Sequence, residues 1–310
     1  MSKHVLGIDL GTSAVKLLLW KGTEDVEKAR AAYSEISPKG WLSAIAEAAK
    51  TLDLSSLGAI GLSSQVGTYV VNRQAVISWN EGAGHEELAF LKAKYSKETF
   101  IREIAMPHPD IVSYPLPRLL YIQKKFPEIK SVCQPKDFLC EALCGRLVSE
   151  KYSWRGLAHT KNDGYSAYFL REIGIDESLL PPLIPFDAEV GKTTAECEKT
   201  LHIPSGIPVY AGLNDFFASL LGMGIEKSGD MFDITGTSEH LGLLEDALSP
   251  DTKMVSGVYF DTYIHYGVTG SSGASSDFAI REFGRDSLEI LSRIEKNPPI
   301  FTSGDGSKND

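Results

Sequence analysis

The stretch VLGIDLGTSAVKLLLW (residues 5–20) places two apolar runs on either side of a Gly-Thr-Ser tripeptide. Large and β-branched apolar residues flanking a short glycine-containing turn are typical of a β-hairpin, so we expect strands over residues 5–10 and 14–20. The first run is predicted to be fully buried, yet it contains Asp9. Because an unpaired buried carboxylate is costly, we expect Asp9 to face a cleft.

Further along the chain, helical and strand patterns alternate, which favours an α/β layered domain. Apolar residues at helical spacing, together with glycine and proline stop signals, predict helices over residues 41–52, 86–94, 116–125, 136–144 and 216–223. Short β-branched runs predict strands over residues 59–62, 68–71, 76–79 and 208–211. The polar tail at residues 302–310 has the composition of a disordered segment.

The hairpin sequence recurs later in the chain. GTSAVKLLL (residues 11–19) and GTSEHLGLL (residues 236–244) share the Gly-Thr-Ser turn and a run that ends in leucines, and an apolar stretch precedes each. This repetition favours two domains of related build, each presenting one turn to a shared cleft. The two copies differ at one telling position, because Ile234 stands where the first copy has Asp9.

The two turns suit an anionic ligand. Their backbone N–H groups and two hydroxyls make an anion site without net charge, and two such turns could hold a polyphosphate. In that setting Asp9 would hold water on a Mg²⁺ ion that bridges phosphates. The alternative is an aspartate that caps its own tight turn.

A second acidic position lies in VYAGLNDFFASLLGMG, where Asn214 and Asp215 stand between a strand and an apolar helix. Asp215 would be the N-cap of that helix, or a base that accepts a proton from a hydroxyl nucleophile during phosphoryl transfer. The spacing alone leaves these two alternatives equal.

Composition limits the partners. The chain has 310 residues, 43% of them hydrophobic, with 31 Lys and Arg against 41 Asp and Glu for a net charge of −10. This excess of negative charge argues against binding of nucleic acid or anionic lipid over a broad basic surface. With no targeting or membrane-spanning pattern, we expect a soluble, cytoplasmic protein. The four cysteines form no CxxC pair and are expected to be buried thiols.

Seven segments in order resemble the FGGY family of carbohydrate kinases, which includes xylulokinase, gluconokinase and glycerol kinase. They are GIDLGTSAVK, IGLSSQVGTYVV, ISWNEGAG, PRLLYIQKKFPEI, QPKDFLCEALCGRLVSE, IPSGIPVYAGLND and GDMFDITGTSEHLG. The resemblance implies a ribonuclease H-like (actin-like ATPase) fold of two domains that close on substrate. It implies transfer of the ATP γ-phosphate to a sugar or polyol hydroxyl, with ATP and Mg²⁺ as cofactors.

The resemblance also assigns residues. Asp215 matches the catalytic base of the family and Asp9 its Mg²⁺-associated aspartate. Two groups complete the site: the cofactor would contact Gly11, Thr12, Ser13, Lys16, Gly236, Thr237 and Ser238, and the sugar would contact Gln65, Asn80, Glu81, Asn214 and Asp215.

The chain departs from the family pattern in places. Gly67 stands where xylulokinase-like members carry a sugar-contacting histidine, and Glu81 stands in the family's Trp-Asn-Asp motif. Residues 1–228 match the sugar-kinase domain, whereas residues 229–301 match only part of the second, nucleotide-binding domain. We therefore also consider a silent sugar-binding protein and one subunit of a split kinase. A homodimer or a C-terminal partner chain would accompany such a fragment.

Overall fold

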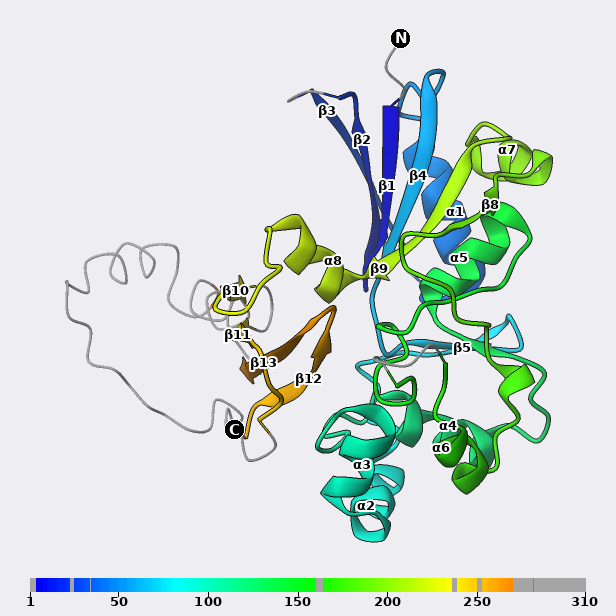
Figure 1. Ribbon diagram of the computed structural model, residues 1–310. Coiled ribbons are helices and arrows are strands. Elements are labelled where there is room, and N and C mark those ends of the chain that lie inside the picture. The colour runs from blue at the N-terminus through cyan, green and yellow to red at the C-terminus, as the bar shows by residue number, and fades with distance from the viewer. Residues whose placement is uncertain are drawn as a thin grey trace. The chain divides into compact units, whose positions relative to one another are not determined.

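The computed structural model describes residues 4–22, 25–33, 35–159, 164–235, 239–249, 253–269 and 281. The chain divides between Met223 and Gly224 into two compact units. Figure 1 shows the path of the chain from the N-terminal strands to the second unit. The predicted tail and most of residues 270–301 lie outside the described residues.

The first unit is built on a six-stranded sheet with the order β3-β2-β1-β4-β9-β8. Its strands are β1 (His4–Leu10), β2 (Ala14–Trp20), β3 (Val26–Ala32), β4 (Leu57–Ser64), β8 (Glu189–Lys192) and β9 (Pro208–Asn214). The predicted hairpin is confirmed, since β1 pairs antiparallel with β2. β1 also pairs parallel with β4, and β4 with β9, so three neighbouring strands end at the same edge.

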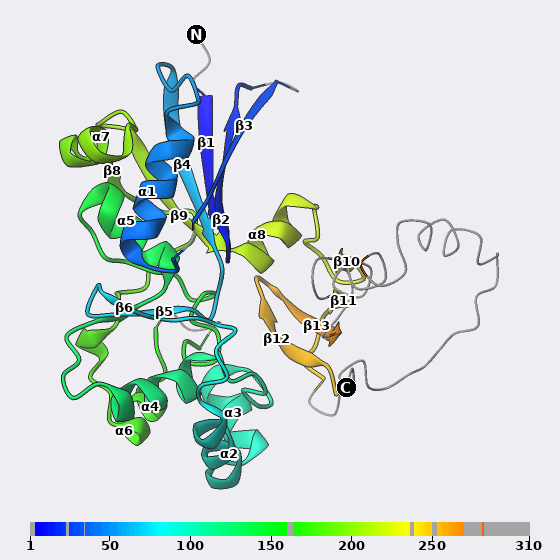
Figure 2. The same ribbon diagram turned by 180° about the vertical axis from the view of Figure 1, so that it is seen from behind.

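One face of this sheet carries the core. Helices α1 (Pro38–Ala49), α5 (Pro135–Cys144) and α7 (Ala195–Leu201) cover it, as Figures 1 and 2 show from opposite sides. Leu6, Ile8 and Leu10 of β1 point into this core. Because successive side chains of a strand alternate between faces, Asp9 lies on the other face. The prediction of a fully buried strand is therefore wrong, since β1 is fully buried on one face only.

A smaller subdomain completes the first unit. Its three-stranded sheet has the order β6-β5-β7, formed by β5 (Tyr69–Val71), β6 (Ala75–Ile77) and β7 (Val132–Cys133). Four helices pack with it around a separate aromatic core that includes Tyr69, Phe100 and Trp154. These helices are α2 (His85–Lys94), α3 (Lys97–Ile104), α4 (Pro115–Lys125) and α6 (Ala167–Ile173), and they lie below the larger sheet in Figure 1.

Some predicted boundaries were wrong for local reasons. α1 begins at Pro38 rather than Trp41 because Ser37 accepts a hydrogen bond from the Gly40 N–H as its N-cap. β6 ends at Ile77 rather than Trp79. The 3₁₀ turn η1 (Glu177–Leu179) and the elements β3, β7, β8, α3, α6 and α7 were not predicted.

α8 (Asp215–Gly222) ends the first unit. The second unit contains a four-stranded antiparallel sheet with the order β10-β11-β13-β12. Its strands are β10 (Met231–Thr235), β11 (Glu239–Glu245), β12 (Val255–Tyr259) and β13 (Thr262–Thr269). The apolar runs flanking the second Gly-Thr-Ser thus form antiparallel strands, with Thr235 opposite Glu239. Within the described part of the chain, no helix is long and apolar enough to cross a lipid bilayer.

Candidate active site

The polar residues of the first unit gather where β1, β4 and β9 end. Leu10 lies opposite Ser64, and Ser64 lies opposite Asn214, so the last residues of the three parallel strands are in register. Asp9, Gln65 and Asp215 each adjoin this row. In open α/β sheets, ligands bind outside the carboxyl ends of the strands.

Gly212 makes this alignment of β9 possible. Its φ is +66°, and a Cβ placed there would lie 1.8 Å from the carbonyl oxygen of Leu62 on β4. The pairing of β4 with β9 shifts register at this point. Only glycine tolerates both this backbone conformation and so close an approach. Gly212 thus lets β9 continue to Asn214 and deliver Asp215 to the sheet edge.

The turn after β1 is braced from two sides. The Gly11 N–H donates to the Ala14 carbonyl oxygen at 3.1 Å, and the Gly11 carbonyl oxygen accepts hydrogen bonds from the Tyr33 hydroxyl and from Gln65 Nε2, the latter at 3.1 Å. The Thr12 hydroxyl oxygen accepts a hydrogen bond from the Trp79 indole at 3.0 Å. Ser13 is exposed.

Asp9 points away from the core beside Lys16, its neighbour across the hairpin. Asp9 Oδ2 lies 3.4 Å from Lys16 Nζ. Asp9 Oδ1 is inaccessible to solvent and has no hydrogen-bond partner among the residues that the structure describes. The alternative in which Asp9 caps its own turn finds no support, because Oδ1 has no partner among the described residues and Oδ2 pairs with Lys16. An orphaned carboxylate oxygen suits a hydrated divalent cation.

Asp215 is the first residue of α8, and it is not the N-cap. Asn214 holds that position, where its Oδ1 accepts a hydrogen bond from the Phe217 N–H at 3.0 Å. The N-cap alternative for Asp215 is therefore wrong. Burial raises the pKa of Asp215 to about 7. The negative charge of Asp9 adds to this rise, whereas the hydrogen bond from the Phe216 N–H and the positive charge of Lys16 oppose it. A carboxylate with this pKa is suited to accept a proton near neutral pH.

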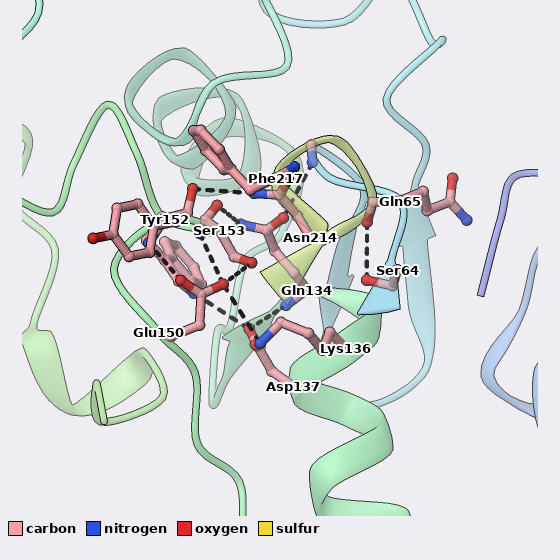
Figure 3. A network of polar contacts seen from close by, with 12 residues as sticks. Ser64, Gln65, Gln134, Lys136, Asp137, Glu150, Tyr152, Ser153, Asn214 and Phe217 are labelled. Atoms are coloured by element: carbon pink, nitrogen blue, oxygen red, sulfur yellow. Dashed lines mark hydrogen bonds and ion pairs between the residues drawn. The ribbon is translucent and has the colours of Figure 1, made fainter. Parts of the chain in front are cut away.

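A buried polar network holds Asn214 in place, as Figure 3 shows. Asn214 Nδ2 donates to the carbonyl oxygen of Tyr152 at 3.3 Å. The Glu150 carboxylate accepts the backbone N–H groups of Tyr152 and Ser153 at 2.6 and 3.0 Å. Lys136 Nζ lies 3.5 Å from Glu150, and both side chains are only 1% exposed. Residues far from Asp215 in sequence thus fix the start of its helix.

The predicted sugar-contacting residues fall into two groups. Gln65 is only 2% exposed, and its amide is engaged at both ends, with Gly11 and with the Thr68 hydroxyl. Asn80 and Glu81 are exposed in the segment that follows β6. A sugar contact by these side chains stays a prediction.

Sequence reasoning missed Trp79, Thr68 and Tyr33, which brace the Gly11–Thr12 turn. Trp79 could have been identified from the sequence, because it precedes Asn80 in a segment already assigned to the site.

Gly236, Thr237 and Ser238 of the second turn lie outside the described residues. In the described ranges, no cluster of three or more His, Cys, Asp and Glu side chains is placed to hold a metal ion. Of the cysteines, all four are free, and only Cys144 is partly exposed.

Comparison with known proteins places these features in context. The model of the "FGGY family of carbohydrate kinases, N-terminal domain" matches residues 4–222. A xylulose kinase from Staphylococcus xylosus is 26% identical over 261 residues, covering 76% of this chain and 54% of the relative. A xylulose kinase from Bacillus subtilis is 27% identical over 337 residues, covering 97% of this chain and 66% of the relative.

Solved structures support the same fold. A ligand-bound xylulose kinase from Lactobacillus acidophilus superimposes with a TM-score of 0.80 at 19% identity, covering 94% of this chain and 66% of the other. The predicted α/β fold of actin-like ATPase type is confirmed. The chain thus spans between about half and two thirds of the length of these relatives.

Proposed function

Since the chain belongs to the FGGY family of carbohydrate kinases, we propose that it transfers the γ-phosphate of ATP to a hydroxyl of a small sugar or polyol. The observation that carries the proposal is the position of Asp215. Its carboxylate has a pKa of about 7 and adjoins the sheet edge where Asp9 and the braced Gly11–Ser13 turn also lie.

In this reaction Asp215 is the general base. Its carboxylate accepts the proton of the acceptor hydroxyl while that oxygen forms a bond to the γ-phosphorus, and the bond from phosphorus to the β,γ-bridging oxygen breaks to release ADP. The Asn214 cap keeps Asp215 at the start of α8, so the base is held in one place. Proton acceptance by a positioned base contributes about 10²- to 10⁴-fold to such rates.

The turn and Asp9 would hold the nucleotide. The backbone N–H groups and hydroxyls of Thr12 and Ser13, which follow Gly11 in the turn, offer donors to phosphate oxygens, and Lys16 offers a positive charge. Asp9, with its unpartnered Oδ1, fits a hydrated Mg²⁺ ion. When bound, Mg²⁺ neutralises the charge that develops on the phosphates. The second turn at residues 236–238 enters this proposal from the sequence alone.

The relatives and the residues near Gly67 indicate which class of sugar or polyol accepts the phosphate. The relatives are xylulose kinases, so a ketopentose is the first acceptor to test, followed by aldoses, sugar acids and polyols. Gly67 has a φ of +78°, and a Cβ there would lie 2.8 Å from the Ser113 Cβ. Ser113 therefore occupies the space beside this position, which leaves no room for a larger side chain. We infer an acceptor pocket that differs here from that of xylulokinase-like members.

The test is ADP release by the 310-residue chain with Mg²⁺-ATP across this panel. We expect a rise that depends on one class of acceptor and that Asp215→Asn abolishes. Asp53→Asn is the matched control, since exposed Asp53 precedes β4 at the opposite edge of the sheet. A sugar that raises the melting temperature without any ADP release would support the silent sugar-binding alternative instead. ADP release that is equal in Asp215→Asn would contradict the base role.

The proposed reaction also indicates where the protein acts and which partners it has. A kinase that consumes ATP and a free sugar is expected in the cytoplasm. A homodimer or a partner chain carrying the remaining third of the family's length would be detected by mass measurement after purification from native cells.

A further inference from the structure

A closed ring of hydrogen bonds joins the Gly11–Thr12 turn to the segment after β6. Four bonds form it: Gln65 Nε2 to the Gly11 carbonyl oxygen at 3.1 Å, Thr68 Oγ1 to Gln65 Oε1 at 3.2 Å, the Trp79 N–H to Thr68 Oγ1 at 3.1 Å, and Trp79 Nε1 to Thr12 Oγ1 at 3.0 Å. The covalent link between Gly11 and Thr12 closes the ring. Residues 67 positions apart in sequence are thereby held together.

The chemistry of each group fixes the direction of every bond. The Gly11 carbonyl oxygen only accepts, so Gln65 turns its NH₂ toward Gly11 and its oxygen toward Thr68, whose hydroxyl hydrogen goes to that oxygen. The Trp79 backbone N–H only donates, so the Thr68 oxygen accepts from it. An indole N–H also only donates, so Thr12 Oγ1 must accept from Trp79. The hydrogen of the Thr12 hydroxyl then remains available to another acceptor.

A buried arginine holds the Trp79 end of the ring. Arg118 is 0% exposed, and its Nη2 donates to the carbonyl oxygens of Ser78, Trp79 and Glu81 at 3.0, 3.2 and 2.9 Å. Three bonds from one nitrogen to one short segment restrict its movement. The Trp79 side chain is 44% exposed, so its indole reaches Thr12 from a rigid backbone rather than from the packed core.

We infer that Trp79 is a positioning residue for the phosphate-binding turn: its indole N–H orients the Thr12 hydroxyl so that the hydroxyl hydrogen is presented to a phosphate oxygen. This rests on the proposed function, because it assigns the turn to a phosphate. Phosphate oxygens accept hydrogen bonds, so a Thr12 hydroxyl that is already an acceptor toward Trp79 is set to donate to them. Gln65 and Thr68 complete the brace by holding the Gly11 carbonyl and the Trp79 backbone.

The first test needs no enzyme activity. The chain has four tryptophans, and ¹⁵N labelling of their indoles gives one N–H signal each, with Trp79→Phe identifying the one of interest. Thr12→Val is expected to shift that signal and to speed its exchange with solvent about 3- to 10-fold, the range of one neutral hydrogen bond. Thr12→Ser keeps the hydroxyl and is expected to restore the original behaviour. A Trp79 signal that does not respond to Thr12→Val overturns the inference.

The second test is a double-mutant cycle on Mg²⁺-ATP affinity, measured by calorimetry. Trp79→Phe keeps an aromatic ring but loses the N–H, and is expected to weaken binding about 3- to 10-fold. In a Thr12→Val background the same change is expected to have no effect, because the hydroxyl is already gone. Trp20→Phe, at the far end of β2 from the turn, is the matched control and should bind as the parent does.

If the effects of Trp79→Phe and Thr12→Val simply multiply, Trp79 does not act through Thr12 and the inference fails. The proposed function fails by a different result, namely the absence of acceptor-dependent ADP release. The two outcomes are measured independently and cannot be confused.

Discussion

Asp137 and Asp215 are two carboxylates in the first turn of a helix, and burial raises the pKa of both, to about 6 and about 7. Their surroundings differ. Asp137 is 0% exposed, and its Oδ2 accepts hydrogen bonds from the Gln134 N–H at 2.8 Å and the Trp154 indole at 3.2 Å. Asp215 is partly exposed at the sheet edge, accepts one bond from the Phe216 N–H, and lies near Asp9.

The difference teaches that a raised pKa does not by itself identify a catalytic base. Asp137 is enclosed by α5 and by Trp154, so no acceptor hydroxyl can reach it. Asp215 combines its raised pKa with access and with a position at the carboxyl ends of parallel strands. We therefore assign a structural role to the first aspartate and propose a chemical role for the second.

The largest expected effect comes from exchanging each carboxylate for an amide. Asp215→Asn is expected to lower kcat by about 10²- to 10⁴-fold, because an amide cannot accept the proton. At pH 4, where the carboxyl of the parent is protonated, the variant is expected to keep the free energy of unfolding within about 1 kcal/mol of the parent. Asp137→Asn is expected to show the reverse, losing about 1–3 kcal/mol of stability with kcat changed only a few-fold. Steady-state kinetics and urea unfolding of both variants measure these effects. If the two variants lost the same amount of kcat and of stability, the two aspartates would not have different roles.

Removing the buried cation beside Asp137 tests the structural half of the comparison. Lys136 Nζ lies 3.5 Å from Glu150; burial alone would lower the pKa of Lys136, but Glu150 and Asp137 raise it overall. Lys136→Met is expected to cost about 3–5 kcal/mol in urea unfolding, because Glu150 is left as an uncompensated buried charge. Lys130→Met, at a lysine whose side chain is 70% exposed, is the control and should cost almost nothing. A loss below about 1 kcal/mol for Lys136→Met would show that Glu150 does not need its partner.

Sequence alone predicted the parts of this site that depend on neighbours along the chain. The hairpin around residues 11–13, the helix after Asp215 and the acidic pair Asp9 and Asp215 all follow from local patterns. β3 was missed because VEKARAA carries charges on a half-exposed edge strand and lacks an apolar run. The local pattern also left two roles open for Asp215, and the Asn214 cap excludes one of them, the N-cap.

The rest depends on contacts between distant segments, which no local pattern encodes. The bond from Trp79 to Thr12 spans 67 residues, and that from Asn214 to Tyr152 spans 62. Lys136 and Glu150 lie in the segment QPKDFLCEALCGRLVSE, which resembles the family. Because Lys136 stands among other polar residues at the start of a helix, the sequence does not indicate that its side chain is buried. Each of these contacts joins segments that only the three-dimensional fold brings together, such as the β1–β2 turn and the segment after β6.

The pH dependence of kcat/KM tests whether Asp215 is the titrating base. If Asp215 is the base, kcat/KM rises as the carboxyl ionises, reaches a plateau above about pH 7, and falls about tenfold for each unit below it. Asp9→Asn removes a neighbouring negative charge, so the pKa of Asp215 falls and the limb moves to lower pH. A pH–rate profile of the parent and of Asp9→Asn measures both. A limb that stays in place in Asp9→Asn would mean that Asp9 does not act on the titrating group.

The same pKa has a consequence for stability. A carboxyl whose pKa is about 7 in the folded chain, against 3.8 as its ordinary value, binds its proton more tightly when folded. Its stabilising contribution is therefore complete below about pH 4 and is lost as the pH rises through 7. In Asp215→Asn this part of the decline in unfolding free energy between pH 4 and pH 7 should disappear, whereas Asp137→Asn should remove a decline that ends near pH 6.

The smallest expected effect concerns Asn214, the residue that connects the two aspartates. Its Oδ1 caps α8 and its Nδ2 binds the Tyr152 carbonyl, which the Lys136–Glu150 pair holds in place. Asn214→Ala removes both bonds and is expected to cost about 1 kcal/mol of stability and a few-fold in kcat, because the start of α8 loosens around Asp215. Asn214→Ser retains a capping oxygen but cannot reach Tyr152, so it separates the two contributions. If Asn214→Ser restores stability while kcat stays low, the bond to Tyr152 is what positions Asp215. If it restores both stability and kcat, the helix cap alone is sufficient. In that case the buried network around Asp137 has no part in the chemistry.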